Sequence, residues 1–200
     1  MPDWEKLTQN LEKNGFEVVR FPTARQAAEY VDSRLNGRSI GVGGSMTVRE
    51  MGLYPMLAGH NRVYWHWAPD AGADTQKKAA GAEVYLTSVN GLSETGVLVN
   101  IDGGGNRVSS TLCGHEEVWF LVGQNKIAPD EEGALWRARN IAAPKNAQRL
   151  GRKTPCALRG DKCYDCQSPQ RICRGMVTLW RKPFGIPKGV VVLVEEDLGY

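Results

Sequence analysis

The sequence predicts an α/β domain with a mostly parallel sheet flanked by helices. Strand-like and helix-like segments alternate between residues 16 and 88, and such alternation is typical of parallel strands connected through helices. A strand over 39–42 opens into a glycine turn, and a strongly apolar strand over 189–194 lies near the end of the chain. We therefore expect residues 1–200 to form one domain, with the last strand in the main sheet.

Local patterns support each expected element. Trp4, Leu7 and Leu11 repeat at helical spacing, which indicates a helix over 3–14. A strand over 16–21 and a helix over 24–35, capped by Thr23, follow it. The other expected elements are a helix from Ser45 or Thr47 to about Met51, strands over 62–67, 83–88, 97–99 and 118–122, and helices over 71–80, 134–142 and 144–150.

Composition indicates a globular protein without a membrane span or a nucleic-acid partner. Hydrophobic residues make up 42% of the 200 residues, and the net charge is only +3. The basic residues are denser over 145–182, where a solvated basic face is the simpler interpretation and an anionic ligand is the alternative. No apolar run reaches the roughly 20 residues that cross a bilayer, and the polar start lacks a signal peptide, so we expect a cytoplasmic protein.

The stretch over 86–127 gathers polar side chains at the ends of expected strands. Loops in such places carry the chemistry of α/β folds, so we expect a site that binds a small anionic ligand here. Glu94 would be the nucleophile or general base, and Lys126 would supply positive charge. The expected ligand-binding residues of this stretch are Asp102, Asn106, Arg107 and Asn125. The alternative is that Glu94 and Asp102 pair with Arg107 and Lys126 only to order the loops.

The glycine turn over 41–47 is a second candidate for ligand binding. Glycines allow a close approach of the backbone, and hydroxyl groups at the start of a helix can donate to an anion. The candidate residues are Gly41, Gly43, Gly44, Ser45 and Thr47. The alternative is a tight turn in which glycine only supplies a positive φ. The turn is neither a Walker loop nor a dinucleotide fingerprint.

Four cysteines form a candidate metal site within the cysteine-rich segment over 154–175. Cys156, Cys163, Cys166 and Cys173 follow the spacing C-x6-C-x2-C-x6-C, and four thiolates suit either Zn²⁺ or a [4Fe–4S] cluster. The alternatives are reduced thiols on a loop or a redox dithiol formed by Cys163 and Cys166.

Several motifs together resemble one family. GVGGSMT, SETGVLVNIDGGGNRV, VGQNKI and DKCYDCQSPQRIC, with the final EEDLGY, are similar to the lactate utilisation (LUD) domain proteins of the LutC/YkgG type. The resemblance implies a fold like that of ribose-phosphate isomerase and the CoA transferases, with a cysteine-rich C-terminal insertion. It also implies a role in lactate or related organic-acid utilisation, beside partner iron–sulfur proteins.

Three functions follow from these observations. The first is an LUD domain protein that binds a small anionic ligand as one subunit of an iron–sulfur oxidoreductase system. The second is an enzyme similar to CoA transferases or sugar-phosphate isomerases that uses Glu94. The third is a metal- or redox-sensing interaction module that acts through the cysteine-rich segment.

Overall fold

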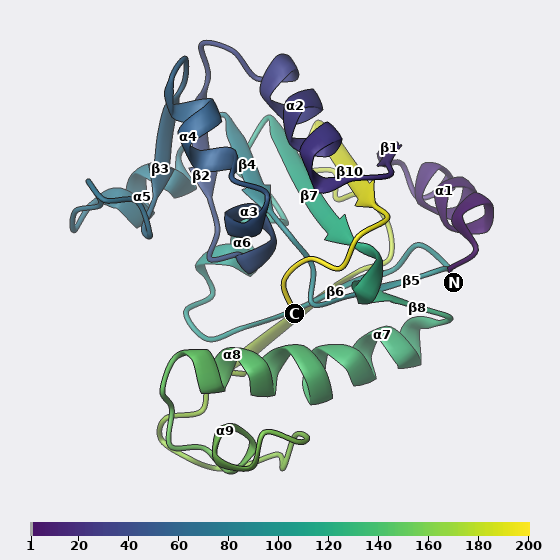
Figure 1. The fold of residues 1–200 in the computed structure, drawn as a ribbon, viewed down its shortest axis with the longest axis vertical. Helices are drawn as coiled ribbons and strands as arrows, with labels where there is room; N and C mark the ends of the chain where they lie inside the picture. The colour runs from purple at the N-terminus through teal and green to yellow at the C-terminus, as the bar shows by residue number, and fades with distance from the viewer. Residues whose placement is uncertain (1) are drawn as a thin grey trace.

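A six-stranded parallel sheet forms the centre of the computed structural model, which describes residues 2–200 (Figure 1). In spatial order its strands are β1 (Glu17–Phe21), β10 (Lys188–Val194), β7 (Glu117–Gly123), β4 (Val84–Thr87), β2 (Ser39–Val42) and β3 (Arg62–Trp65). Every neighbouring pair is parallel. The predicted α/β class is therefore confirmed, and the last strand, β10, lies inside the main sheet between β1 and β7.

A second sheet of four strands was not expected from the sequence. Its order is β8 (Ile127–Ala128), β5 (Gly91–Ser93), β6 (Leu98–Asp102) and β9 (Gly175–Leu179). β6 pairs antiparallel with both β5 and β9. β9 follows the cysteine-rich segment, so its pairing with β6 returns the chain to the body of the protein.

Helices cover both sheets. They are α1 (Trp4–Lys13), α2 (Ala24–Arg34), α3 (Met46–Glu50), α4 (Leu53–Ala58), α5 (Thr75–Ala80), α6 (Asn106–Ser110), α7 (Glu131–Arg137), α8 (Ala143–Arg149) and α9 (Pro155–Arg159). A π-helical turn, Ala138–Ala142, joins α7 to α8, where two separate helices were expected. Pro144 lies in the first turn of α8 and has no N–H to donate to the preceding turn. The wider π-helical turn therefore joins the two helices without that hydrogen bond. None of the helices described is long and apolar enough to cross a membrane.

Alternating side chains divide the core into two apolar layers. On β7, Trp119 and Leu121 face α2, α3 and α4, while Val118 and Phe120 face α1 and the second sheet. Leu92 of β5 belongs to this latter layer, and a third cluster packs the other face of the second sheet against α7. Figure 1 shows the result, with α7 and α8 running beneath the second sheet and α9 below α8.

Candidate functional site

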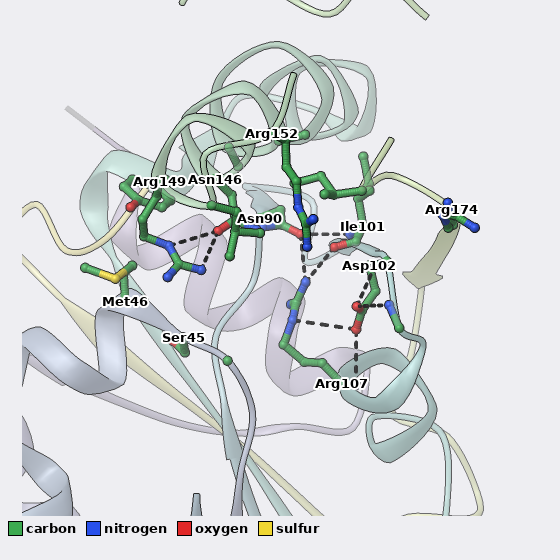
Figure 2. Close-up of a pocket in the computed structure, with 18 of the residues that line it drawn as sticks. Ser45, Met46, Asn90, Ile101, Asp102, Arg107, Asn146, Arg149, Arg152 and Arg174 are labelled. Carbon is green, nitrogen blue, oxygen red and sulfur yellow. Dashed lines mark hydrogen bonds and ion pairs between the residues drawn. The ribbon is translucent and has the colours of Figure 1, made fainter. Parts of the chain in front are cut away.

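A cavity of about 410 Å³ lies at the carboxyl ends of the main-sheet strands. One wall follows β2, β4 and β7, where Ser45, Ser88 and Lys126 lie. Helix α8 and the end of the cysteine-rich segment form the opposite wall. In Figure 2, Asn146 and Arg149 point from α8 towards Ser45 and Met46. Parallel strands place ligands at this edge of a sheet, so the cavity has the position of a binding site.

The charge of the cavity is strongly positive. Its acidic lining residue, Asp102, is outnumbered by six basic ones: Arg107, Lys126, Arg149, Arg152, Arg171 and Arg174. Four of these six come from residues 149–174, within the stretch for which a solvated basic face was the simpler interpretation. The structure brings them into the same cavity, which favours the alternative, an anionic ligand.

Arg107 and Asp102 are held by their own neighbours. The Asp102 carboxylate accepts hydrogen bonds from the backbone N–H groups of Gly103 (2.6 Å), Gly104 (3.1 Å) and Arg107 (3.1 Å). The Arg107 guanidinium donates to the side chain of Asn100, to Asn90 Oδ1 (3.2 Å) and to the carbonyl of Ile101 (2.6 Å). Burial lowers the pKa of Arg107, and Asp102 opposes that shift. Both residues therefore order the cavity floor.

Arg149 presents its guanidinium to the cavity from α8. It donates to Asn146 Oδ1 through Nε (3.1 Å) and Nη2 (2.8 Å), and it lies 4.8 Å from the centre of the Trp67 ring. A guanidinium carries five N–H groups, so others remain for a ligand. His66, beside Trp67, also lines the cavity, and burial lowers the pKa of its imidazole, with Arg149 adding to the effect.

Lys126 is the most deeply buried basic group of the cavity, with only 4% of its surface exposed. Its Nζ donates to Thr47 Oγ1 (2.7 Å) and Ser88 Oγ (2.9 Å). Burial, together with the charges of Arg137 and Arg107 and against the opposing charge of Glu50, lowers the pKa of the amine to about 7. A lysine in this state is largely neutral just above neutral pH, and a neutral amine is a nucleophile.

The C-terminal tail passes over this amine. Asn125 fixes the tail, because its Oδ1 accepts from the N–H of Leu198 (3.1 Å) and its Nδ2 donates to the carbonyl of Gly199 (3.3 Å). Gly199 has a φ of +62°, and a Cβ there would lie 2.7 Å from Thr47 Oγ1 and 3.3 Å from Lys126 Nζ. Asn125 therefore positions the tail, and Tyr200 continues it into the cavity lining.

Comparisons with known proteins agree with this fold. A model of the LUD domain matches residues 4–194, which is nearly the whole chain. This chain belongs to the LUD domain family. The family is associated with lactate utilisation. A comparison with curated proteins gave no match.

A solved structure supports the fold of this LUD domain. The crystal structure of a DUF162 family protein from Deinococcus radiodurans is similar, with a TM-score of 0.54 and 14% identity. The match covers 95% of this chain and 94% of the other. At that identity, the likeness carries the fold and says nothing about a ligand.

Some residues of the glycine turn line the cavity, and others pack against neighbouring elements. Gly44 and Ser45 line the cavity, whereas Gly41 and Gly43 do not. A Cβ on Gly41 would lie 2.3 Å from the carbonyl oxygen of Ala79, and one on Gly43 would lie 3.0 Å from the Tyr85 hydroxyl. None of these glycines has a positive φ, so close packing explains them better than turn geometry does. Thr47 reaches the site through Lys126.

Glu94 lies outside the cavity, although the sequence led us to expect it in the same cleft. Its carboxylate accepts a hydrogen bond from the backbone N–H of Asp3 (3.0 Å) and forms an ion pair with Lys6 (3.2 Å). These contacts lie at the start of α1. The Glu94 carboxylate therefore binds the N-terminus of α1. Asn106, in contrast, lines the cavity as expected.

The four cysteines are not arranged as a ligand set. Within residues 2–200, the structure has no group of three or more His, Cys, Asp or Glu side chains that could hold a metal ion. Cys156 is buried against Ala147 and Ala157, and its sulfur contacts Thr154 Oγ1 (3.3 Å). Cys163, Cys166 and Cys173 are partly exposed, and burial raises the pKa of Cys173. The Zn²⁺ or [4Fe–4S] site at these four cysteines therefore stays a prediction.

Reasoning from the sequence missed most of the cationic wall. His66 was not among the candidates, and the four arginines of this wall were noticed only as part of the basic stretch: Arg149, Arg152, Arg171 and Arg174. The Arg171 guanidinium donates to the carbonyls of Cys173 and Cys166 (both 2.8 Å), which folds the cysteine-rich segment beside the cavity. The density of basic residues over 145–182 was the signal that could have found this wall.

Proposed function

We propose that this LUD domain binds a small organic anion in the cavity, as the ligand-binding member of a system that uses lactate or a related organic acid. The observation that carries the proposal is the excess of basic side chains over the single acidic side chain among the described lining residues, Asp102. Arg107 Nε lies 3.9 Å from the Asp102 carboxylate, and this guanidinium offsets the repulsion that Asp102 exerts on an incoming anion. In that system, the iron–sulfur partner proteins implied by the resemblance would carry the electrons.

The anchors for the anion are Arg149 and Arg152. Arg107 is committed to Asn100, Asn90 and Ile101, and Arg171 and Arg174 donate to carbonyl groups of the cysteine-rich segment. Among residues 2–200, the Arg149 guanidinium donates hydrogen bonds only to Asn146, through one edge, and Arg152 follows it on the same wall. A guanidinium recognises a carboxylate or phosphate through two parallel hydrogen bonds, which gives both affinity and orientation.

The second candidate, a CoA-transferase-like enzyme that uses Glu94, is less well supported. Such a nucleophile must reach the bound substrate, and the Glu94 carboxylate contacts Asp3 and Lys6 instead of the cavity. The proposal therefore does not include Glu94. Loss of ligand binding on substituting Glu94→Gln would restore it to the site.

Thermal unfolding with and without anions tests the proposal. A ligand that binds the folded state raises the melting temperature by mass action, so lactate, pyruvate, 2-oxoglutarate and phosphate are compared at matched ionic strength. A hydrogen bond to a charged group is worth about 1.5–3 kcal/mol, so Arg149→Gln or Arg152→Gln should weaken binding by roughly ten- to a hundredfold.

The matched control is Arg25→Gln on α2. Arg25 is exposed and pairs with Glu29 far from the cavity lining, so its removal changes the net charge equally without changing the site. Equal losses of affinity in all three variants would show that the anion binds the protein surface non-specifically, which would overturn the proposal.

A further inference from the structure

We propose that Lys126 forms a covalent imine with the carbonyl carbon of its ligand, so that the ligand is a 2-oxo acid or a related carbonyl-bearing carboxylate. This inference rests on the proposed function, because the cationic wall must first bind the carboxylate. It adds a nucleophile and a substrate class to that site. The observations that carry it are the burial of the amine, its hydrogen bonds and its place in the cavity wall.

The hydrogen bonds of Lys126 leave its lone pair free. The Thr47 hydroxyl donates to the carbonyl of Leu198 (3.2 Å), so Thr47 Oγ1 must accept from the amine at 2.7 Å. Ser88 Oγ takes the second N–H at 2.9 Å. A neutral amine has two N–H groups and one lone pair. With both N–H groups donated to hydroxyls of the wall, the lone pair is the part of the nitrogen left for an electrophile in the cavity.

The surroundings of the amine favour its neutral form. Its two partners are hydroxyls, and the guanidinium groups of Arg137 and Arg107 lie close enough to lower its pKa. Arg137 is itself buried and fixed by the carbonyls of Asn125 and Asn90 (both 2.6 Å). A buried cation without a paired anion is costly, and losing a proton relieves that cost. Glu50 opposes this, but its carboxylate accepts from the N–H of Gly199 (2.5 Å).

The chemistry balances with the groups present. The Lys126 lone pair forms a C–N bond with the carbonyl carbon, and the π electrons move to the oxygen. Transfer of one amine proton to that oxygen gives a carbinolamine. The second nitrogen proton and the hydroxyl group then leave as one molecule of water, and the C=N bond forms. His66, an imidazole in the same cavity whose pKa is lowered by burial, can carry protons between these steps.

The two recognition elements define the ligand class. The arginine wall selects a carboxylate, and the amine selects a ketone or aldehyde carbon, which a 2-hydroxy acid or a phosphate lacks. A 2-oxo acid carries both groups on adjacent carbons. The cavity of about 410 Å³ is large enough for such a molecule with a longer side chain than that of pyruvate.

Reductive trapping tests the proposal. The full-length protein is incubated at pH 7 with pyruvate or 2-oxoglutarate and cyanoborohydride, which reduces an imine to a stable secondary amine, and peptide mass spectrometry locates the adduct. An unperturbed lysine, with a pKa of about 10.4, is almost fully protonated at this pH and reacts slowly. The expected result is one reduced adduct per chain, on Lys126.

Two variants make the test selective. Lys126→Met removes the amine and should abolish the adduct, while Lys145→Met removes an exposed lysine of α8 and should leave it unchanged. Mapping of the unsubstituted protein needs no variant, so a folding defect in Lys126→Met would not obscure the answer. Reversible 2-oxo acid binding without an adduct on Lys126, or adducts spread over exposed lysines, would overturn the imine and leave the anion site standing. Absence of both binding and adduct would overturn both.

Discussion

Replacing Lys126 by methionine should change how stability depends on pH. Burial and the charges of Arg137 and Arg107, opposed by Glu50, bring the pKa of the folded-state amine from 10.5 to about 7. Between these values, the unfolded chain binds a proton that the folded protein does not, so stability rises with pH. Below about pH 7 both states are protonated, and the folded protein bears the full cost of the buried charge.

The magnitude follows from proton linkage. At 1.36 kcal/mol for each pKa unit, integration from pH 6 to pH 9 gives a gain of roughly 3 kcal/mol in the unfolding free energy of the unsubstituted protein. Lys126→Met lacks this gain and keeps the apolar stem of the side chain. Its stability relative to the unsubstituted protein should therefore fall by roughly 3 kcal/mol between pH 6 and pH 9.

Urea unfolding at a series of pH values measures this difference. Other titrating groups contribute equally to both proteins and cancel in the comparison. Lys145→Met is the control, because an exposed amine stays in water whether the chain is folded or unfolded. A difference between Lys126→Met and the unsubstituted protein that stays constant from pH 6 to pH 9 would refute the reasoning, because the buried amine would then titrate like an exposed one.

Three further predictions concern residues that the sequence singled out. Gly41→Ala should lower the unfolding free energy by about 2 kcal/mol or more, because its Cβ would lie 2.3 Å from the Ala79 carbonyl oxygen. The control Gly59→Ala, whose nearest contact would lie at 3.5 Å, should cost far less, and equal urea midpoints for the two variants would contradict this. Glu94→Gln should change stability by at most about 1 kcal/mol and leave anion affinity unchanged in calorimetric titration, since it removes a partly exposed ion pair with Lys6. Chelators should not change the melting temperature, and thiol titration should find Cys163 and Cys166 reactive while Cys156 stays protected. Stoichiometric metal release that exposes all four thiols together would contradict the geometry.

The sequence predicted the main sheet because its strands carry long apolar runs. β7 and β10 are buried on both faces, and such runs show clearly in the sequence. The second sheet gave no comparable signal. β5 and β8 have three and two residues, and β9 is only partly buried, so pairing with neighbours defines these strands more than their own composition does.

The site was predicted only where its residues lie at strand ends. Lys126, Asp102 and Arg107 follow strands of the two sheets and were found by that rule. Arg149 and Arg152 reach the cavity because α8 passes beneath the sheets, which no local pattern reveals. Glu94 fitted the same rule and still lies elsewhere, because α1 folds back against its carboxylate.

A crystal structure of the protein grown with 2-oxoglutarate tests the anion site most directly. We expect the ligand carboxylate to bind the guanidinium groups of Arg149 and Arg152, with its carbonyl carbon facing Lys126 Nζ. Ligand density elsewhere on the protein, with this cavity filled only by water at saturating concentration, would contradict the assignment of the cavity as the binding site.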